Sequence, residues 1–144
     1  MNRVLRSTVM LVSLAASGCV LFQPPRLLPT AETAVVRAGE WGEIYRGGYV
    51  RIDSVTGRTP SWSNSREIAV GRGEQTGVFE VLLCLSGERN CPELARAELR
   101  FETEPGHTYL VRAREKVNGS NQFWVWVEDE QTGALAGGSR PPSR

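Results

Sequence analysis

The sequence predicts an all-β protein: a small antiparallel β-sandwich of about six to eight strands, immunoglobulin-like or prealbumin-like, after an N-terminal signal peptide. Three observations predict this fold class. The 144 residues suffice for one domain at about 150 residues per domain. From Thr33 onward apolar residues recur with a period of two, the period of strands. Gly- and Pro-containing turns separate these runs, and no segment makes a persuasive helix.

The first 18 residues read as a secretory signal peptide. Arg3 and Arg6 supply positive charge near the amino terminus, and residues 9–16 form a short apolar run. A membrane-spanning helix needs about 20 apolar residues. The run before Cys19 is too short for that and contains Arg6, so we expect a signal peptide that is cleaved off the mature protein.

Residues 14–19, LAASGC, resemble the lipobox of bacterial lipoproteins. The resemblance implies cleavage before Cys19, a diacylglyceryl thioether on its sulfur and acylation of the new amine. Ala16 stands where the family most often has Leu, and ordinary signal cleavage or a free thiol are the alternatives. Val20 stands where Asp would signal retention in the inner membrane. The resemblance therefore implies an anchor in the outer membrane, facing the periplasm.

A Pro-rich tether is expected between this anchor and the domain, over residues 19–32. Pro24, Pro25 and Pro29 exclude a regular helix and favour extended backbone. Residues 20–33 would reach roughly 40 Å at ~3.1 Å each, unless Leu27 and Leu28 dock on the domain. We expect the β-sandwich over 33–137 and a disordered tail over 138–144.

The clearest strand is 95–104, where odd positions are apolar or small, apart from Thr103, and even positions are charged. The other strand-like runs are 35–36, 49–55, 67–70, 78–85, 108–114 and 123–127. The first is expected at a sheet edge. The runs 78–85 and 123–127 are apolar on both faces, as inner strands should be. Cys91 to Arg96 could form a single helical turn that starts at Pro92.

The turn at Pro105-Gly106 carries a register constraint. The inward residues on both sides of it are odd-numbered, whereas a two-residue loop would pair odd with even positions and turn one strand inside out. We therefore expect a three-residue loop, a bulge or a crossing between the two sheets. In the first case Glu98 would face Arg114. Asn118-Gly119 and Thr132-Gly133 mark the turns that follow.

The two remaining cysteines, Cys84 and Cys91, are expected to form a disulfide, because the compartment outside the cytoplasm is oxidising. A redox or metal pair is the alternative, but the spacing does not suit it and only His107 is available as another soft ligand. We expect no metal and no cofactor.

Few residues offer chemistry. His107 follows a turn and reads as exposed, with Glu102 and Glu104 near it in sequence. Residues 128–130 are acidic but lack a calcium-loop pattern, and Asp129 reads as the start of a turn. We expect no catalytic residue.

The tryptophans give the one indication of a ligand site. Trp124 and Trp126 share one strand face and Phe123 shares the other with two valines. Either all are core, or the Trp face is open and binds sugars or a protein. Trp41 and Trp62 lie in loop-like segments and are further candidate surface anchors.

Charge gives no reason to expect a nucleic-acid partner. The chain has 17 basic and 16 acidic residues, and loss of Arg3 and Arg6 with the signal peptide leaves a net charge of −1.

The runs 99–111 and 123–129, followed by Thr132-Gly133, resemble a group of small uncharacterised bacterial lipoproteins. The shared pattern is an apolar strand, a Gly turn, an aromatic-bearing strand and a strand that ends in an Asp–Thr-Gly turn. It covers roughly half of the mature chain, and Gly71-Arg72-Gly73-Glu74 replaces a Pro-Gly turn common in the group. The resemblance implies an envelope β-sandwich and transfers no catalytic residue.

We therefore expect a non-enzymatic envelope accessory or binding module, anchored in the bilayer through acylated Cys19 and facing an envelope protein partner. Two alternatives stay open. One is a glycan- or peptidoglycan-binding module that uses exposed Trp124 and Trp126. The other is a small hydrolase based on His107, although no Gly-x-Ser-x-Gly motif accompanies it.

Overall fold

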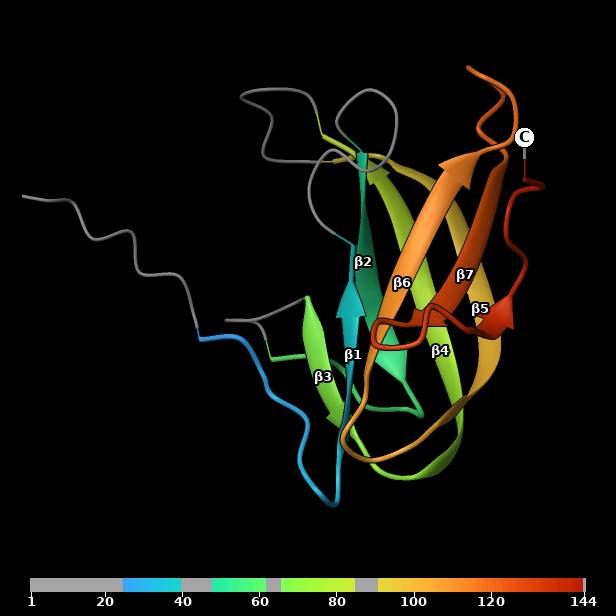
Figure 1. Cartoon of the computed structure of the whole chain (residues 1–144). Helices are drawn as coiled ribbons and strands as arrows, with labels where there is room; N and C mark the ends of the chain where they lie inside the picture. The colour runs from blue at the N-terminus through green and yellow to red at the C-terminus, as the bar shows by residue number, and fades with distance from the viewer. Residues whose placement is uncertain (1–24, 40–47, 62–65, 85–90, 144) are drawn as a thin grey trace, which may run out of the picture.

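Two β-sheets pack face to face around one hydrophobic core (Figure 1). The computed structural model describes residues 25–39, 48–61, 66–84 and 91–143. Its strands are β1 (Ala34–Ala38), β2 (Gly48–Val55), β3 (Glu67–Val70), β4 (Gly73–Leu83), β5 (Glu93–Thr103), β6 (Thr108–Glu115), β7 (Phe123–Asp129) and β8 (Leu135–Gly138). One sheet has the order β3-β1-β6-β7-β8 and the other β2-β4-β5. The predicted all-β sandwich is confirmed, and no helix able to span a membrane occurs in the described residues.

The sequence predicted that the first strand lies at a sheet edge, and this prediction is wrong. The strand lies inside the larger sheet. β1 pairs antiparallel with β3 on one side and parallel with β6 on the other. Val35 and Val36 are both completely buried, one on each face of the sheet. A strand this short with two buried faces gives no alternation, so its sequence could not show that it has two neighbours.

The chain crosses from one sheet to the other at Pro105-Gly106, which is one of the three solutions that the register constraint allowed. β5 ends in the three-stranded sheet and β6 begins in the five-stranded sheet (Figure 1). Phe101 and Tyr109 therefore both reach the core from opposite layers. Glu98 lies opposite Val78 on β4 and is not a partner of Arg114.

β4 is longer than predicted because a buried polar network replaces apolar alternation at its start. The Gln75 side-chain amide donates to the carbonyl oxygens of Gly71 and Gly73 and to Thr103 Oγ1. Thr56 Oγ1 donates to Gln75 Oε1 at 2.6 Å. Every polar atom of this buried amide thus has a partner, which removes the cost of burying it.

No helical turn forms at Pro92, because β5 begins at Glu93, which pairs with Leu82 of β4. That pairing brings the chain back beside β4. The predicted disulfide between Cys84 and Cys91 is present, with the two Cα atoms 4.6 Å apart. The crosslink therefore joins the end of β4 to the segment that leads into β5.

β8 closes the side of the sandwich where the two sheets would otherwise separate. Its backbone lies so close to β5 that a Cβ on Gly137 would stand 2.8 Å from the Cβ of Phe101. The strand was not predicted, since its sequence, Leu-Ala-Gly-Gly, has little β-propensity. The expected tail 138–144 overlaps this strand: the Ser139 amide donates to the Val125 carbonyl, and Arg140 binds Glu128.

Candidate functional site

The candidate site lies on the face of the five-stranded sheet that is turned away from the core, here called the outer face. Cross-strand partners share a face, so the register defines its rows. Arg112 lies opposite Trp126, and Arg114 opposite Trp124. Val125 and Val127, between and beyond the tryptophans, are buried in the core. The two tryptophans are half-buried and accessible from the outer face.

Trp126 borders a shallow groove of about 290 Å³, lined also by Arg112, Ala113, Arg114 and Pro141. Gly138 is its partner on β8 and has no side chain to cover the indole. The indole N–H donates to Glu128 Oε2 at 3.0 Å. An oriented aromatic ring beside guanidinium groups in an open groove is a surface suited to stacking against a flat ligand.

The face of the Trp124 ring is in contact with Lys116. The ammonium group of Lys116 lies 4.6 Å from the centroid of the indole ring, within range of a cation–π interaction. A second shallow hollow of about 240 Å³ borders it, next to Phe123, Leu99 and Ser139. Of the two rings, Trp126 is therefore the one that lines the groove.

Glu128 organises this part of the outer face. Its carboxylate accepts from the Trp126 indole, lies 2.6 Å from Arg112 Nε and 3.0 Å from a terminal nitrogen of Arg140. Three side chains from β6, β7 and the segment after β8 are thus held by one half-buried carboxylate. Its role is to orient the ring and the guanidinium that line the groove.

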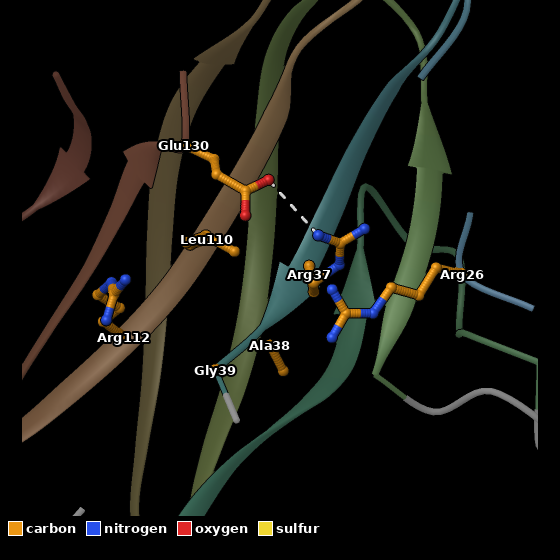
Figure 2. A pocket seen from close by; sticks show the side chains of 7 residues that line it. All are labelled: Arg26, Arg37, Ala38, Gly39, Leu110, Arg112 and Glu130. Atoms are coloured by element: carbon orange, nitrogen blue, oxygen red, sulfur yellow. Dashed lines mark hydrogen bonds and ion pairs between the residues drawn. The ribbon is translucent and has the colours of Figure 1, made fainter. Parts of the chain in front are cut away.

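A second feature, here called the arginine hollow, adjoins the groove. It has a volume of about 150 Å³ and is lined by Arg26, Arg37, Ala38, Gly39, Leu110, Arg112 and Glu130. Figure 2 shows Arg26 and Arg37 on one side of Leu110 and Arg112 on the other, with Glu130 reaching toward Arg37.

Arg37 is oriented by three contacts around the hollow. Its Nε donates to Glu67 Oε1 at 2.5 Å, and Glu67 is only 5% exposed. One terminal nitrogen donates to the Leu27 carbonyl at 3.3 Å. The other lies 3.5 Å from Glu130 Oε2, and the Glu130 side chain is 45% exposed. The guanidinium is thus oriented by a buried carboxylate and faces the hollow with its weakest contact.

The segment before β1 is attached to the same place. The Leu27 amide donates to Glu67 Oε2 at 2.7 Å, so both oxygens of Glu67 are used. Thr30 Oγ1 accepts from the amides of Glu32 and Thr33 and forms a compact turn. Residues from Leu27 onward therefore belong structurally to the domain, while the Leu28 side chain is 77% exposed.

His107 lies apart from this face and is not a free surface histidine. Its Nδ1 is bonded to Asp129, not to Glu102 or Glu104, and its ring stacks on Tyr109 with centroids 6.3 Å apart. No Ser, Thr or Cys side chain of the described residues hydrogen-bonds to the imidazole. The described residues also contain no cluster of His, Cys, Asp and Glu able to hold a metal ion.

Three candidates from the sequence, Cys19, Trp41 and Trp62, lie outside the described residues. Sequence reasoning found Trp124 and Trp126 but missed the arginine hollow. The alternation of Arg112 and Arg114 was a visible signal on β6. The sequence could not show that Arg37 lies beside these two arginines, because the parallel pairing of β1 with β6 joins segments about seventy residues apart.

No protein-family model matches this chain, and no curated protein and no solved structure is significantly similar to it.

Proposed function

We propose that this protein is a lipid-anchored, non-enzymatic binding module of the cell envelope that holds a glycan on the outer face of its five-stranded sheet. The observation that carries the proposal is the position of Trp126. Its ring is half-exposed, fixed by Glu128 and set in a groove between Arg112 and Pro141. Sugar rings present flat apolar faces and a rim of hydroxyls, which match an aromatic surface surrounded by polar hydrogen-bonding groups.

The arrangement supports binding better than catalysis. A hydrolase needs a nucleophile or a positioned water next to a base. The groove contains guanidinium groups and an indole, and Glu128 is engaged by three partners. His107 is bound to Asp129 away from the groove.

A protein partner is the second candidate function, and one observation favours it. Leu135 of β8 lies opposite Glu128 on the outer face and is 48% exposed. Tryptophan and arginine next to an exposed aliphatic side chain are typical of binding hot spots between proteins. Such a partner would cover the β7–β8 end of the face.

The anchor follows from the lipobox resemblance at Cys19. Replacing Cys19→Ser should move the protein from the membrane fraction to the soluble fraction, because attachment requires the acyl chains. A Cys19→Ser chain that remains in the membrane fraction after a salt wash would disprove the lipid anchor.

The ligand face is tested with the full-length protein in detergent micelles. Sedimentation with isolated peptidoglycan and with insoluble neutral polysaccharides gives the bound fraction. We expect Trp126→Ala to weaken binding about tenfold, which corresponds to about 1.4 kcal/mol. Trp126→Phe should retain most binding, because it keeps a ring.

Val117→Ala is the matched control, since Val117 is an exposed apolar residue in the β6–β7 turn. Equal binding of Trp126→Ala and wild type would exclude this face as the glycan site. Crosslinking in intact cells then distinguishes the two candidates: a single dominant protein attached through β7 and β8 would favour the protein partner.

A further inference from the structure

The arginine hollow and the tryptophan groove are two parts of one surface, because Arg112 lines both. Arg112 is the cross-strand partner of Trp126, and Arg37 is the partner of Leu110 on the same strand as Arg112. Neighbouring strands lie about 4.8 Å apart, so β7 and β1 are separated by about 10 Å. A short oligosaccharide on Trp126 is long enough to reach the hollow.

Charge on this surface differs from that of the chain as a whole. The outer face and its border carry Arg26, Arg37, Arg112, Arg114, Lys116 and Arg140, against Glu67, Glu128 and Glu130. The whole chain, by contrast, has a net charge of only +1. Basic groups gathered on one face of a nearly neutral protein attract an anionic ligand to that face.

Arg37 is prepared to bind an anion. Glu67 and the Leu27 carbonyl fix its orientation, so the guanidinium does not have to be ordered when a ligand arrives. Its contact with Glu130 is long, at 3.5 Å, and Glu130 is well exposed. The Arg37 side chain is only 13% exposed, but the Glu130 end of the pair lies in solvent and the contact is long, so a carboxylate or phosphate can replace Glu130 while Glu130 turns to solvent. Guanidinium groups bind both anions through paired N–H donors.

We propose that the ligand is an acidic glycan: its carboxylate or phosphate group occupies the arginine hollow while a neighbouring sugar ring stacks on Trp126. This inference rests on the proposed glycan-binding function and adds the class of glycan. Glu130 then acts as a competitor of the ligand anion.

The test compares each acidic glycan with an uncharged counterpart that has the same sugar backbone. The probes are oligogalacturonate and its methyl ester, and a phosphorylated oligomannose and its dephosphorylated form. Binding is measured by calorimetry on the full-length protein in a neutral detergent. We expect at least one acidic probe to bind about tenfold or more tighter than its neutral counterpart, with an affinity that falls as salt is added.

Charge variants locate the anion. Arg26→Gln should weaken binding of the acidic probe about fivefold and leave the neutral probe unchanged. Glu130→Gln should strengthen binding of the acidic probe about threefold, because it removes the competing carboxylate. Arg100→Gln and Glu102→Gln are the matched controls: both residues are exposed on β5 of the other sheet, and neither change should alter binding.

The outcomes separate the two proposals. Equal binding of acidic and neutral probes, lost in Trp126→Ala, would overturn the inference and leave the glycan-binding function standing. Absence of binding to every probe and to peptidoglycan would overturn both. Binding of the Cys19→Ser chain to phosphatidylglycerol vesicles, lost in Arg26→Gln and without any glycan binding, would assign the hollow to lipid headgroups and also overturn the inference.

Discussion

The Nδ1 atom of His107 lies 2.6 Å from the Oδ2 atom of Asp129, and this pair connects the crossing between the sheets to the end of β7. The other carboxylate oxygen of Asp129 accepts the amides of Gln131 and Thr132 and shapes the β7–β8 turn. Burial raises the pKa of Asp129, but the bonds from His107 and from the two amides outweigh it and hold the pKa below its usual value.

The first prediction concerns pH. A carboxyl group with a lowered pKa in the folded state stabilises the fold above its unfolded pKa, and this contribution is lost as pH falls through the folded pKa. We expect Asp129→Asn to lower the free energy of unfolding by about 1–2 kcal/mol at pH 7. The difference from wild type should shrink below about pH 4. Urea unfolding at pH 7 and pH 3 measures it, with exposed Glu102→Gln as control. A difference that stays constant would contradict this account.

The second prediction concerns the closure by β8. Gly137→Ala should destabilise the protein by about 1–3 kcal/mol, because the new methyl group meets the Arg100 carbonyl and the Phe101 Cβ. Gly71→Ala is the control: nothing lies within 4 Å of its added Cβ, and its φ is not positive. Thermal unfolding of both variants checks this. Equal midpoints would show that β8 does not pack tightly on β5.

The third prediction concerns a charged row on the three-stranded sheet. Arg51 on β2 and Arg96 on β5 both bind Glu80 on β4, and the Glu80 side chain is 3% exposed. Arg51→Met or Arg96→Met alone should cost less than about 1 kcal/mol, because one partner remains. The loss of unfolding free energy in the double variant should exceed the sum of the two single losses by about 1–3 kcal/mol, because the double variant leaves a buried carboxylate without a cation. Additive free energies of unfolding would refute this coupling.

The fourth prediction concerns the disulfide. Replacing both Cys84 and Cys91 by Ser should lower the free energy of unfolding by about 2.5 kcal/mol on a chain-entropy estimate, given a separation of 7 residues. Thiol labelling of the denatured, unreduced protein should find neither cysteine free. Labelling of Cys84 or Cys91 under those conditions would mean that the bond does not form in the protein as the cell produces it.

Much of the fold was predictable from sequence because several strands have one solvent-exposed face and one buried face. On β5, Arg96, Glu98 and Arg100 point to solvent and Phe101 to the core, as the alternation predicts. The register constraint at Pro105-Gly106 included the crossing that occurs. The alternation of apolar and polar residues does not predict buried segments of other kinds. Gln75 is buried because its side chain is hydrogen-bonded, and β8 packs closely because its glycines have no side chains.

The site was predictable only in part. Trp124 and Trp126 are neighbours on one strand, so the sequence placed them on one face, but it left open whether that face is covered. Arg37 and Glu67 meet through pairings that bring β1 between β3 and β6. Such long-range pairings depend on the whole sheet and leave no trace in local spacing.

The bond between Leu27 and Glu67 limits the reach that the lipid anchor proposed at Cys19 would give the domain. Because Arg26 lines the arginine hollow and residues from Leu27 onward belong to the body, the proposed anchor at Cys19 would leave residues 20–25 as a linker, which would reach roughly 19 Å at ~3.1 Å per residue. That is about half the reach expected if residues 20–33 were all free, so the accessible volume is about eightfold smaller. With the proposed anchor, the effective concentration of the outer face toward ligands near the bilayer would rise in the same proportion, while ligands farther away would be out of range.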